Sequence, residues 1–311
     1  MNNSYKPEGY REHTYHSTQR GTYPTPFAFI GDGKIYEGQT VKCDPHLNLW
    51  IDFCGVRCIM PKEEASFLFD GETLKDIAVI SRVGKSVCFK VIGIAKDEHG
   101  REVPLLSRRL AQIECMENYI SRLSPGDVID AKVTHMEQFG AFCDIGCGII
   151  ALLSVDCISV SRISHPSDRF DVGDRIKAIV KSRSDEGRIY LTHKELYGTW
   201  EENAALFSQG QTVAGIVRSV ESYGIFVELT PNLAGLAEPR DNVFPSQSAA
   251  VFIKSIIPER MKIKLVLIDT KSDPSQKKPI EYIGDVHRCE HIDRWQYSPS
   301  CSSKIIESIF E

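Results

Sequence analysis

A short pattern occurs three times along this chain: an aromatic residue, one further residue and an acid, inside an apolar run. The runs are residues 49–53, 141–145 and 225–229. Alternate side chains of a strand point to opposite faces, so the residues that flank each aromatic form one apolar core face. Each aromatic shares the other face with a carboxylate, and we expect it to face solvent. The three rings, which would form a surface for stacking on flat groups, are Trp50, Phe142 and Phe226.

The repeat extends beyond this pattern. Residues 124–142 align with residues 208–226 without a gap, and an aromatic–Gly pair precedes both phenylalanines. These pairs are Phe139-Gly140 and Tyr223-Gly224. A first unit starts at Glu37 and lacks such a pair. The period of about 80 residues is too long for a solenoid and has the size of a small domain, so we expect three tandem domains.

The middle unit has a readable strand pattern. Short alternating or apolar runs, separated by glycine-containing turns, predict five strands, at residues 128–136, 140–145, 149–153, 175–184 and 188–192. The connection between the third and the fourth strand is the longest. Five short strands with this spacing predict a small five-stranded Greek-key barrel.

Two helical connectors are expected between the units. Residues 107–123 have an apolar stripe at helical spacing, formed by Leu110, Ile113, Met116 (or Glu117), Ile120 and Leu123. Thr199 and Glu202 fit a capping box, which predicts a short helix that ends before Gly210.

Composition places the chain among ordinary soluble proteins, with 42% apolar and 25% charged residues. The polar N-terminus has no apolar run of the signal-peptide type, and no segment is long and apolar enough to span a membrane. The ten cysteines include no Cys-x-x-Cys pair, so we expect reduced thiols and a cytoplasmic protein. A net charge of -5 argues against strongly electrostatic, nonspecific binding to nucleic acid.

The sequence carries no catalytic motif. It contains no Ser-His-Asp signature, no phosphate-binding glycine loop and no His-x-x-x-His pair on a helix, so we expect neither an enzyme nor a cofactor. The C-terminal segment does contain zinc-ligand residue types, but their spacing matches no common site, and we expect no metal. These residues are His287, Cys289, His291 and Cys301.

The middle unit resembles an S1 RNA-binding domain, an oligonucleotide-binding (OB) barrel. The resemblance is carried by Gly126-Asp127, by residues 133–142, by the connection His165–Asp168, by Gly173-Asp174 and by Gly187–Leu191. Segments of the first unit and the linker 196–200 resemble domains of small-subunit ribosomal protein S1, so the resemblance extends over residues 34–269. It implies an all-β fold with helical linkers, made of three tandem S1-type five-stranded OB barrels.

The resemblance divides the chain into seven parts. They are an N-terminal extension (1–33), a degenerate S1-like domain (34–106), a helical linker (107–123), an S1 RNA-binding domain (124–194), a second helical linker (195–207), a second S1-type RNA-binding domain (208–269) and a C-terminal extension (270–311).

The resemblance also implies which residues contact RNA. In S1 domains both aromatics of the aromatic–Gly–x–Phe segment lie on the binding face, and a bulge or bend at Gly140 or Gly224 would bring the two rings to one face. These rings are Phe139, Phe142, Tyr223 and Phe226. A basic residue at the start of the fifth strand corresponds to Arg188. The family's usual third-strand histidine is replaced by Leu152 and Glu238.

Phosphate groups need nearby cations, and both RNA-binding units offer some. In the middle unit these are Lys181, Arg183 and Arg188, and in the third unit Arg218, Lys254, Lys262 and Lys264. Trp50 of the first unit is a candidate for weak stacking. Structural alternatives stay open: the aromatics could cap the barrel ends, Trp50 could pack on a linker helix, and the basic strip could be a solvated strand edge.

Two classes of function remain. The first is a single-stranded RNA (mRNA) binder of translation, resembling ribosomal protein S1 and partnered with the small ribosomal subunit through its N-terminal domain, with no membrane partner. The second is a ribosome- or protein-docking scaffold of S1-type modules, or an S1-domain factor in RNA decay or transcription. The degenerate first unit and the negative net charge favour a docking role for that unit.

Overall fold

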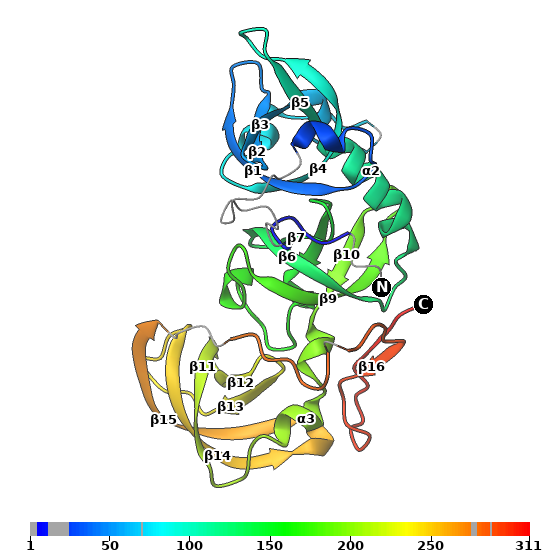
Figure 1. Ribbon diagram of the computed structural model, residues 1–311. Coiled ribbons are helices and arrows are strands. Elements are labelled where there is room, and N and C mark those ends of the chain that lie inside the picture. Colours follow the sequence, from blue (N-terminus) through cyan, green and yellow to red (C-terminus); the bar gives the residue numbers. More distant parts are fainter. Residues whose placement is uncertain (1–4, 12–24, 70, 275–278, 287) are drawn as a thin grey trace. The chain divides into compact units, whose positions relative to one another are not determined.

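The computed structural model describes residues 5–11, 25–69, 71–274, 279–286 and 288–311 (Figure 1). Within these residues the chain forms three closed five-stranded barrels, which confirms the expected fold class. The strands are β1 (Tyr36–Cys43), β2 (Leu49–Phe53), β3 (Val56–Met60), β4 (Ser86–Lys96), β5 (Glu102–Ser107), β6 (Val128–Glu137), β7 (Gly140–Asp144), β8 (Ile150–Ser154), β9 (Arg175–Arg183), β10 (Ile189–Thr192), β11 (Thr212–Glu221), β12 (Gly224–Thr230), β13 (Leu233–Ala237), β14 (Gln247–Ile257) and β15 (Lys262–Pro274).

The described residues also form short helices and one small two-stranded sheet. The α-helices are α1 (Asp76–Ile80), α2 (Arg108–Asn118) and α3 (Trp200–Ala204). The 3-10 helices are η1 (Pro26–Phe29), η2 (Lys62–Glu64), η3 (Ile120–Arg122), η4 (Val155–Cys157), η5 (Pro166–Asp168), η6 (Lys194–Tyr197) and η7 (Pro258–Arg260). A two-stranded sheet is formed by β16 (Arg294–Gln296) and β17 (Glu307–Ile309).

All three barrels have the same topology. The first strand of each lies between the second and the fourth, and the third strand pairs in parallel with the fifth. This order is the Greek-key arrangement of a small closed barrel. The five strands expected in the middle unit are present, each within two residues of its predicted bounds.

The barrels belong to two compact units. The first comprises the described residues up to Leu123 together with Asp144–Ile150, the hairpin tip between β7 and β8. The second comprises Ser124–Cys143 and the described residues from Ala151 to Glu311.

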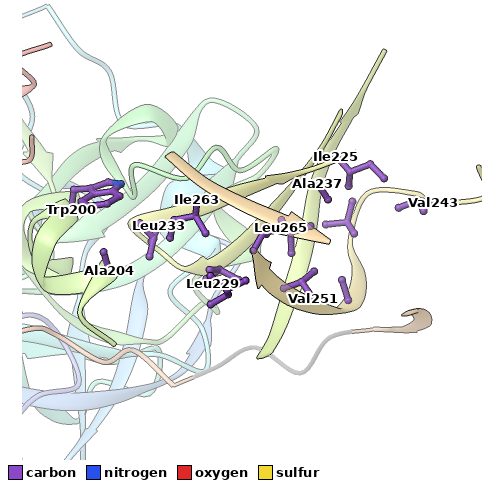
Figure 2. Close-up of a cluster of buried hydrophobic side chains, with 14 of the residues drawn as sticks. Trp200, Ala204, Ile225, Leu229, Leu233, Ala237, Val243, Val251, Ile263 and Leu265 are labelled. Atoms are coloured by element: carbon purple, nitrogen blue, oxygen red, sulfur yellow. The ribbon is translucent and has the colours of Figure 1, made fainter. Parts of the chain in front are cut away.

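The third barrel is filled by the core faces of its strands, and α3 extends this core (Figure 2). Trp200 and Ala204 of α3 are buried in the same cluster as Leu233 and Ile263. The expected capping box is confirmed: the Glu202 N–H donates to Thr199 Oγ1 at 3.2 Å, and the Thr199 N–H donates to Glu202 Oε2 at 2.7 Å. The helical linker is therefore part of the third barrel's core.

Helix α2 is present in the first linker, but its buried face differs from the predicted stripe. Leu110, Ile113 and Met116 are only half-buried. The buried side chains are Arg108, Ala111, Gln112 and Cys115. Arg108 turns inward because Glu8 binds its guanidinium through two contacts, of 2.6 Å and 3.0 Å, and a buried charge is tolerated when it is paired.

The described C-terminal residues are built into the second unit. Strand β15 runs to Pro274, beyond the predicted boundary at residue 269. Farther on, the N–H of Val128 donates to the Glu290 carbonyl at 3.0 Å, and His291 Nδ1 lies 2.7 Å from an oxygen of Asp127. These contacts attach the segment to the start of the middle barrel.

His193 gives this unit a pH-dependent stability. The imidazole is fully buried against the rings of Phe170, Tyr197 and Tyr282, and this burial lowers its pKa to about 3. The unfolded chain takes up a proton at about pH 6.5, but the folded chain does not. The contribution of His193 to the free energy of unfolding is therefore fully present above pH 6.5, and it is lost as the pH falls from there toward 3.

Because His193 takes up a proton only in the unfolded chain, we expect the free energy of unfolding to fall by about 2 kcal/mol between pH 7 and pH 5. Urea unfolding of the wild type and of His193→Gln at both pH values measures the effect. The loss between the two pH values should shrink in the variant by about that amount. An equal loss in both proteins would contradict a neutral, buried His193.

Candidate nucleic-acid interface

The third barrel carries a pair of aromatic rings on its outer surface. Tyr223 lies in the two-residue turn between β11 and β12 and is 66% exposed. Phe226 is half-buried on the outer face of β12, while its neighbours Ile225 and Val227 are fully buried in the core. The two ring centroids lie 6.1 Å apart, with the ring planes at 87°. The pair forms an exposed aromatic corner.

The middle barrel repeats this corner. Phe139 lies in the turn between β6 and β7 and is 56% exposed, and its ring centroid lies 5.9 Å from that of Phe142 at an interplanar angle of 87°. His135 stacks on Phe142, with centroids 5.8 Å apart and the planes within 25°. Phe142 and Phe226, the two phenylalanines of the repeated pattern, thus lie outside the barrel cores, as the alternation predicts.

In the third barrel the two rings reach one face through the turn, and the register shows no bulge at Gly224. In the third barrel Gly224 pairs in regular register with Glu221. The register shift of this hairpin lies on β11, between Val217 and Ser219. Because Tyr223 lies in the turn, strand alternation does not apply to it.

The glycine after each turn has a different role: it lets the next strand approach closely. A Cβ on Gly140 would lie 2.6 Å from the Leu153 carbonyl oxygen, and one on Gly224 would lie 2.7 Å from that of Ala237. Backbone atoms cannot move aside cheaply, so a side chain at either position would displace the hairpin. The aromatic–Gly pair therefore combines an exposed ring with a tight strand contact.

The carboxylates of the pattern share the aromatics' face, but two of them are buried. Asp144 is 1% exposed and accepts the backbone N–H groups of Gly146 and Gly148, at 2.9 Å and 3.0 Å. It also accepts the N–H of Glu8 at 2.7 Å, within the first unit. Burial, together with the nearby Glu8 carboxylate, raises the pKa of Asp144 to about 7. Asp144 thus has a structural role.

Glu228 is the centre of a buried ion-pair cluster. Its Oε2 lies 2.6 Å from Arg169 Nη2 and 2.7 Å from Arg218 Nε. Arg218 Nη1 also lies 3.3 Å from Asp168 Oδ1. The predicted phosphate-binding role of Arg218 is therefore wrong: its side chain is only 9% exposed and contacts two carboxylates.

Trp50 lies on the outer face, as the alternation predicts, but neighbouring side chains cover it. The ring lies outside the barrel core but is only 8% exposed, covered by Ile59 and Val103. Its indole N–H donates to Asp44 at 3.1 Å, and Lys42 Nζ lies 5.0 Å from the ring centroid. The expectation of a solvent-facing stacking residue is therefore wrong here, since neighbouring side chains of the same barrel cover the ring.

We expect Trp50→Ala to destabilise the first barrel by about 3 kcal/mol, because it removes a large buried side chain. Trp50→Phe keeps most of the packing and should cost about 1 kcal/mol, for the lost indole hydrogen bond. Urea unfolding measures both. If Trp50→Ala cost no more than Trp50→Phe, the ring would not be supporting the barrel.

The basic residues predicted for the two barrels are otherwise exposed. In the middle barrel Arg183 ends β9, Arg188 precedes β10, and Lys181 lies with its Nζ 3.2 Å from Cys157 Sγ. In the third barrel Lys254 and Lys262 are exposed on β14 and β15. Positive charge therefore remains at the surface of both barrels.

Strand register places Lys264 on the aromatic face of the third barrel. Phe226 pairs with Leu236, and Leu236 pairs with Lys264, so these three form one row across β12, β13 and β15. In the middle barrel Tyr190, which is 36% exposed, pairs with Leu152. Tyr190 is not among the residues that the sequence predicted to contact RNA, although its alternation with two apolar neighbours indicates an outward-facing side chain.

Other site classes find no support among the residues that the structure describes. These residues contain no cluster of three or more His, Cys, Asp or Glu arranged to hold a metal ion. Of the zinc-type residues noted in the sequence, His287 lies outside the described ranges. None of the described helices has the length and apolar composition needed to span a lipid bilayer.

Comparison with known proteins identifies relatives for part of the chain. Residues 122–194 match the family of the S1 RNA binding domain. The chain is similar to the small ribosomal subunit protein bS1 of Rhizobium meliloti (strain 1021), with 30% identity over 59% of this chain and 35% of the relative. It is also similar to that of Staphylococcus aureus (strain COL), with 29% identity over 68% of this chain and 59% of the relative. The chain thus matches from about a third to three fifths of these relatives' length.

A solved structure also aligns with much of the chain. It is a multidomain protein with nucleic acid binding domains from Streptococcus pneumoniae TIGR4. The alignment covers 76% of this chain and 74% of that chain, at 15% identity and a TM-score of 0.26. This likeness is too low to support a functional comparison.

Proposed function

We propose, from the S1 RNA-binding domain that residues 122–194 form, that this chain binds single-stranded RNA by stacking bases on two aromatic corners. The observation that carries the proposal is the recurrence of the same corner in two barrels: Phe139 with Phe142, and Tyr223 with Phe226. Stacking on an exposed ring contributes about 1–3 kcal/mol per base and tolerates any base. We expect weak sequence preference, as suits the holding of many different mRNAs.

The covalent tethering of the two barrels in one chain supports the proposal. Both corners are on barrels of one compact unit, and tethered sites raise each other's effective concentration. Modest affinity at each corner then suffices for a strand that contacts both. Exposed cations beside the corners, among them Lys264, would contact phosphates.

The contribution of Lys264 to phosphate binding has a direct test. Because Lys264 lies in the row of Phe226, we expect Lys264→Gln to reduce the slope of log affinity against log salt concentration by about 0.7. The matched control is Lys271→Gln, an equally exposed lysine farther along β15. RNA titrations over a range of salt concentrations measure both slopes. Equal slopes for the two variants would remove Lys264 from the interface.

The first barrel favours a second function, docking on a larger assembly. Its only counterpart of the corner phenylalanines, Trp50, is buried, whereas Ile77 and Ile80 of α1 are 67% and 46% exposed. The relatives named small ribosomal subunit proteins suggest the small ribosomal subunit as the partner. Ile77→Ser/Ile80→Ser should then reduce co-sedimentation with small subunits while RNA affinity stays unchanged. Retained co-sedimentation would favour an RNA-only role, as in RNA decay or transcription.

A further inference from the structure

A cavity of about 530 Å³ opens within the second unit, beside the third barrel's aromatic face. Its walls come from η5 and the residue after it, the segment around α3, strands β11 and β12, and Pro279–Ile283 of the C-terminal segment. The volume is in the range of small-molecule sites.

The charges of the cavity favour an uncharged ligand. Arg169 and Arg218 line it, but Glu228 and Asp168 already neutralise both guanidinium groups. Glu281 adds a further carboxylate to the lining. A phosphate group would gain little from paired arginines and would be repelled by an additional carboxylate. The cavity is therefore unsuited to the RNA backbone.

The remaining lining favours a flat, largely apolar group. Leu206, Ile216 and Leu229 provide apolar walls, and Tyr197 adds an aromatic ring. Every nucleobase has a flat π-face that such walls can accept.

The strand β12 connects this cavity to the aromatic corner. Phe226 and Glu228 lie two residues apart on the same face of β12, which is about 7 Å along the strand. Phe226 belongs to the corner and Glu228 to the cavity wall. We propose that the cavity receives one unstacked base of the RNA strand bound at the third barrel, an inference that rests on the proposed RNA-binding function.

Leu206 allows a test that spares the ion-pair cluster. It lines the cavity and is 60% exposed, so Leu206→Trp should fold and fill part of the space, and Leu206→Ala is the matched control that leaves it open. We expect Leu206→Trp to weaken binding of an unstructured oligoribonucleotide about fivefold to a hundredfold, and Leu206→Ala to have little effect. The wild type should lose a similar factor when one base of the strand is replaced by an abasic site, and Leu206→Trp should lose nothing further at that position.

The outcomes separate this proposal from the broader one. If Tyr223→Ala/Phe226→Ala weakens binding but Leu206→Trp and every abasic position next to the stacked bases are neutral, RNA binding stands and the base pocket is overturned. If the aromatic double variant itself binds RNA normally, the proposed function fails. Binding of free adenosine or uridine to the wild type, with the RNA affinity of Leu206→Trp unchanged, would overturn the assignment to an RNA base.

Discussion

Phe139→Ala/Phe142→Ala is expected to weaken binding of single-stranded RNA about thirtyfold or more, down to the affinity that the third barrel supports alone. Each ring offers one stacking surface worth about 1–3 kcal/mol, so two rings contribute about 2–6 kcal/mol. Titration of a labelled, unstructured oligoribonucleotide at fixed salt measures the change. Since Phe139 is 56% exposed and Phe142 lies outside the barrel core, the protein should remain folded.

The matched control for this experiment is Phe244→Ala. Phe244 is 61% exposed but lies in the loop between β13 and β14, outside both aromatic corners. Its removal should leave RNA affinity unchanged. Thermal unfolding of both variants verifies that the fold is intact. Full RNA affinity in the double variant would mean that the corners are only surface aromatics, and an equal loss in Phe244→Ala would mean that the effect is not local.

Glu228→Ala should destabilise the second unit by about 3–5 kcal/mol. Glu228 is 6% exposed and contacts both Arg169 and Arg218, so its removal leaves two buried guanidinium groups with too little opposing charge. Urea unfolding at neutral pH measures the loss.

The matched control is Asp52→Ala, the acid at the corresponding place in the first repeat. Asp52 is exposed, so its removal should change stability by less than about 0.5 kcal/mol. Similar effects of the two substitutions would contradict a cluster specific to Glu228. Glu228→Gln, which keeps the shape and one acceptor oxygen, should fall between the two.

Local sequence determined the strands because their side-chain period is short and strict. The middle barrel's strands follow the apolar alternation within two residues, and the capping box at Thr199 starts α3 as expected. The repeat aligned Phe139 with Tyr223, the resemblance to S1 domains placed both on the binding face, and both are exposed. Strand bounds and helix starts depend on residues that are close together in the sequence, so the sequence alone is enough to predict them.

The buried face of α2 and the close strand contact at the glycine could not be predicted in this way. Arg108 turns into the interior because Glu8, distant in sequence, binds its guanidinium. Gly224 is required because the backbone of β13 approaches it, and alternation within β12 contains no sign of that strand. Both depend on contacts with a segment outside the helix or strand concerned.

The sequence by itself determined that three barrels form and that each carries an aromatic on its outer face, because alternation separates core from surface within a single strand. Only the tertiary structure decided which outward-facing groups are free to meet a ligand. Trp50 is covered by Ile59 and Val103, and Glu228 is enclosed by two arginines, whereas Tyr223 stays exposed. Facing outward is a property of the strand, but exposure depends on what packs over it.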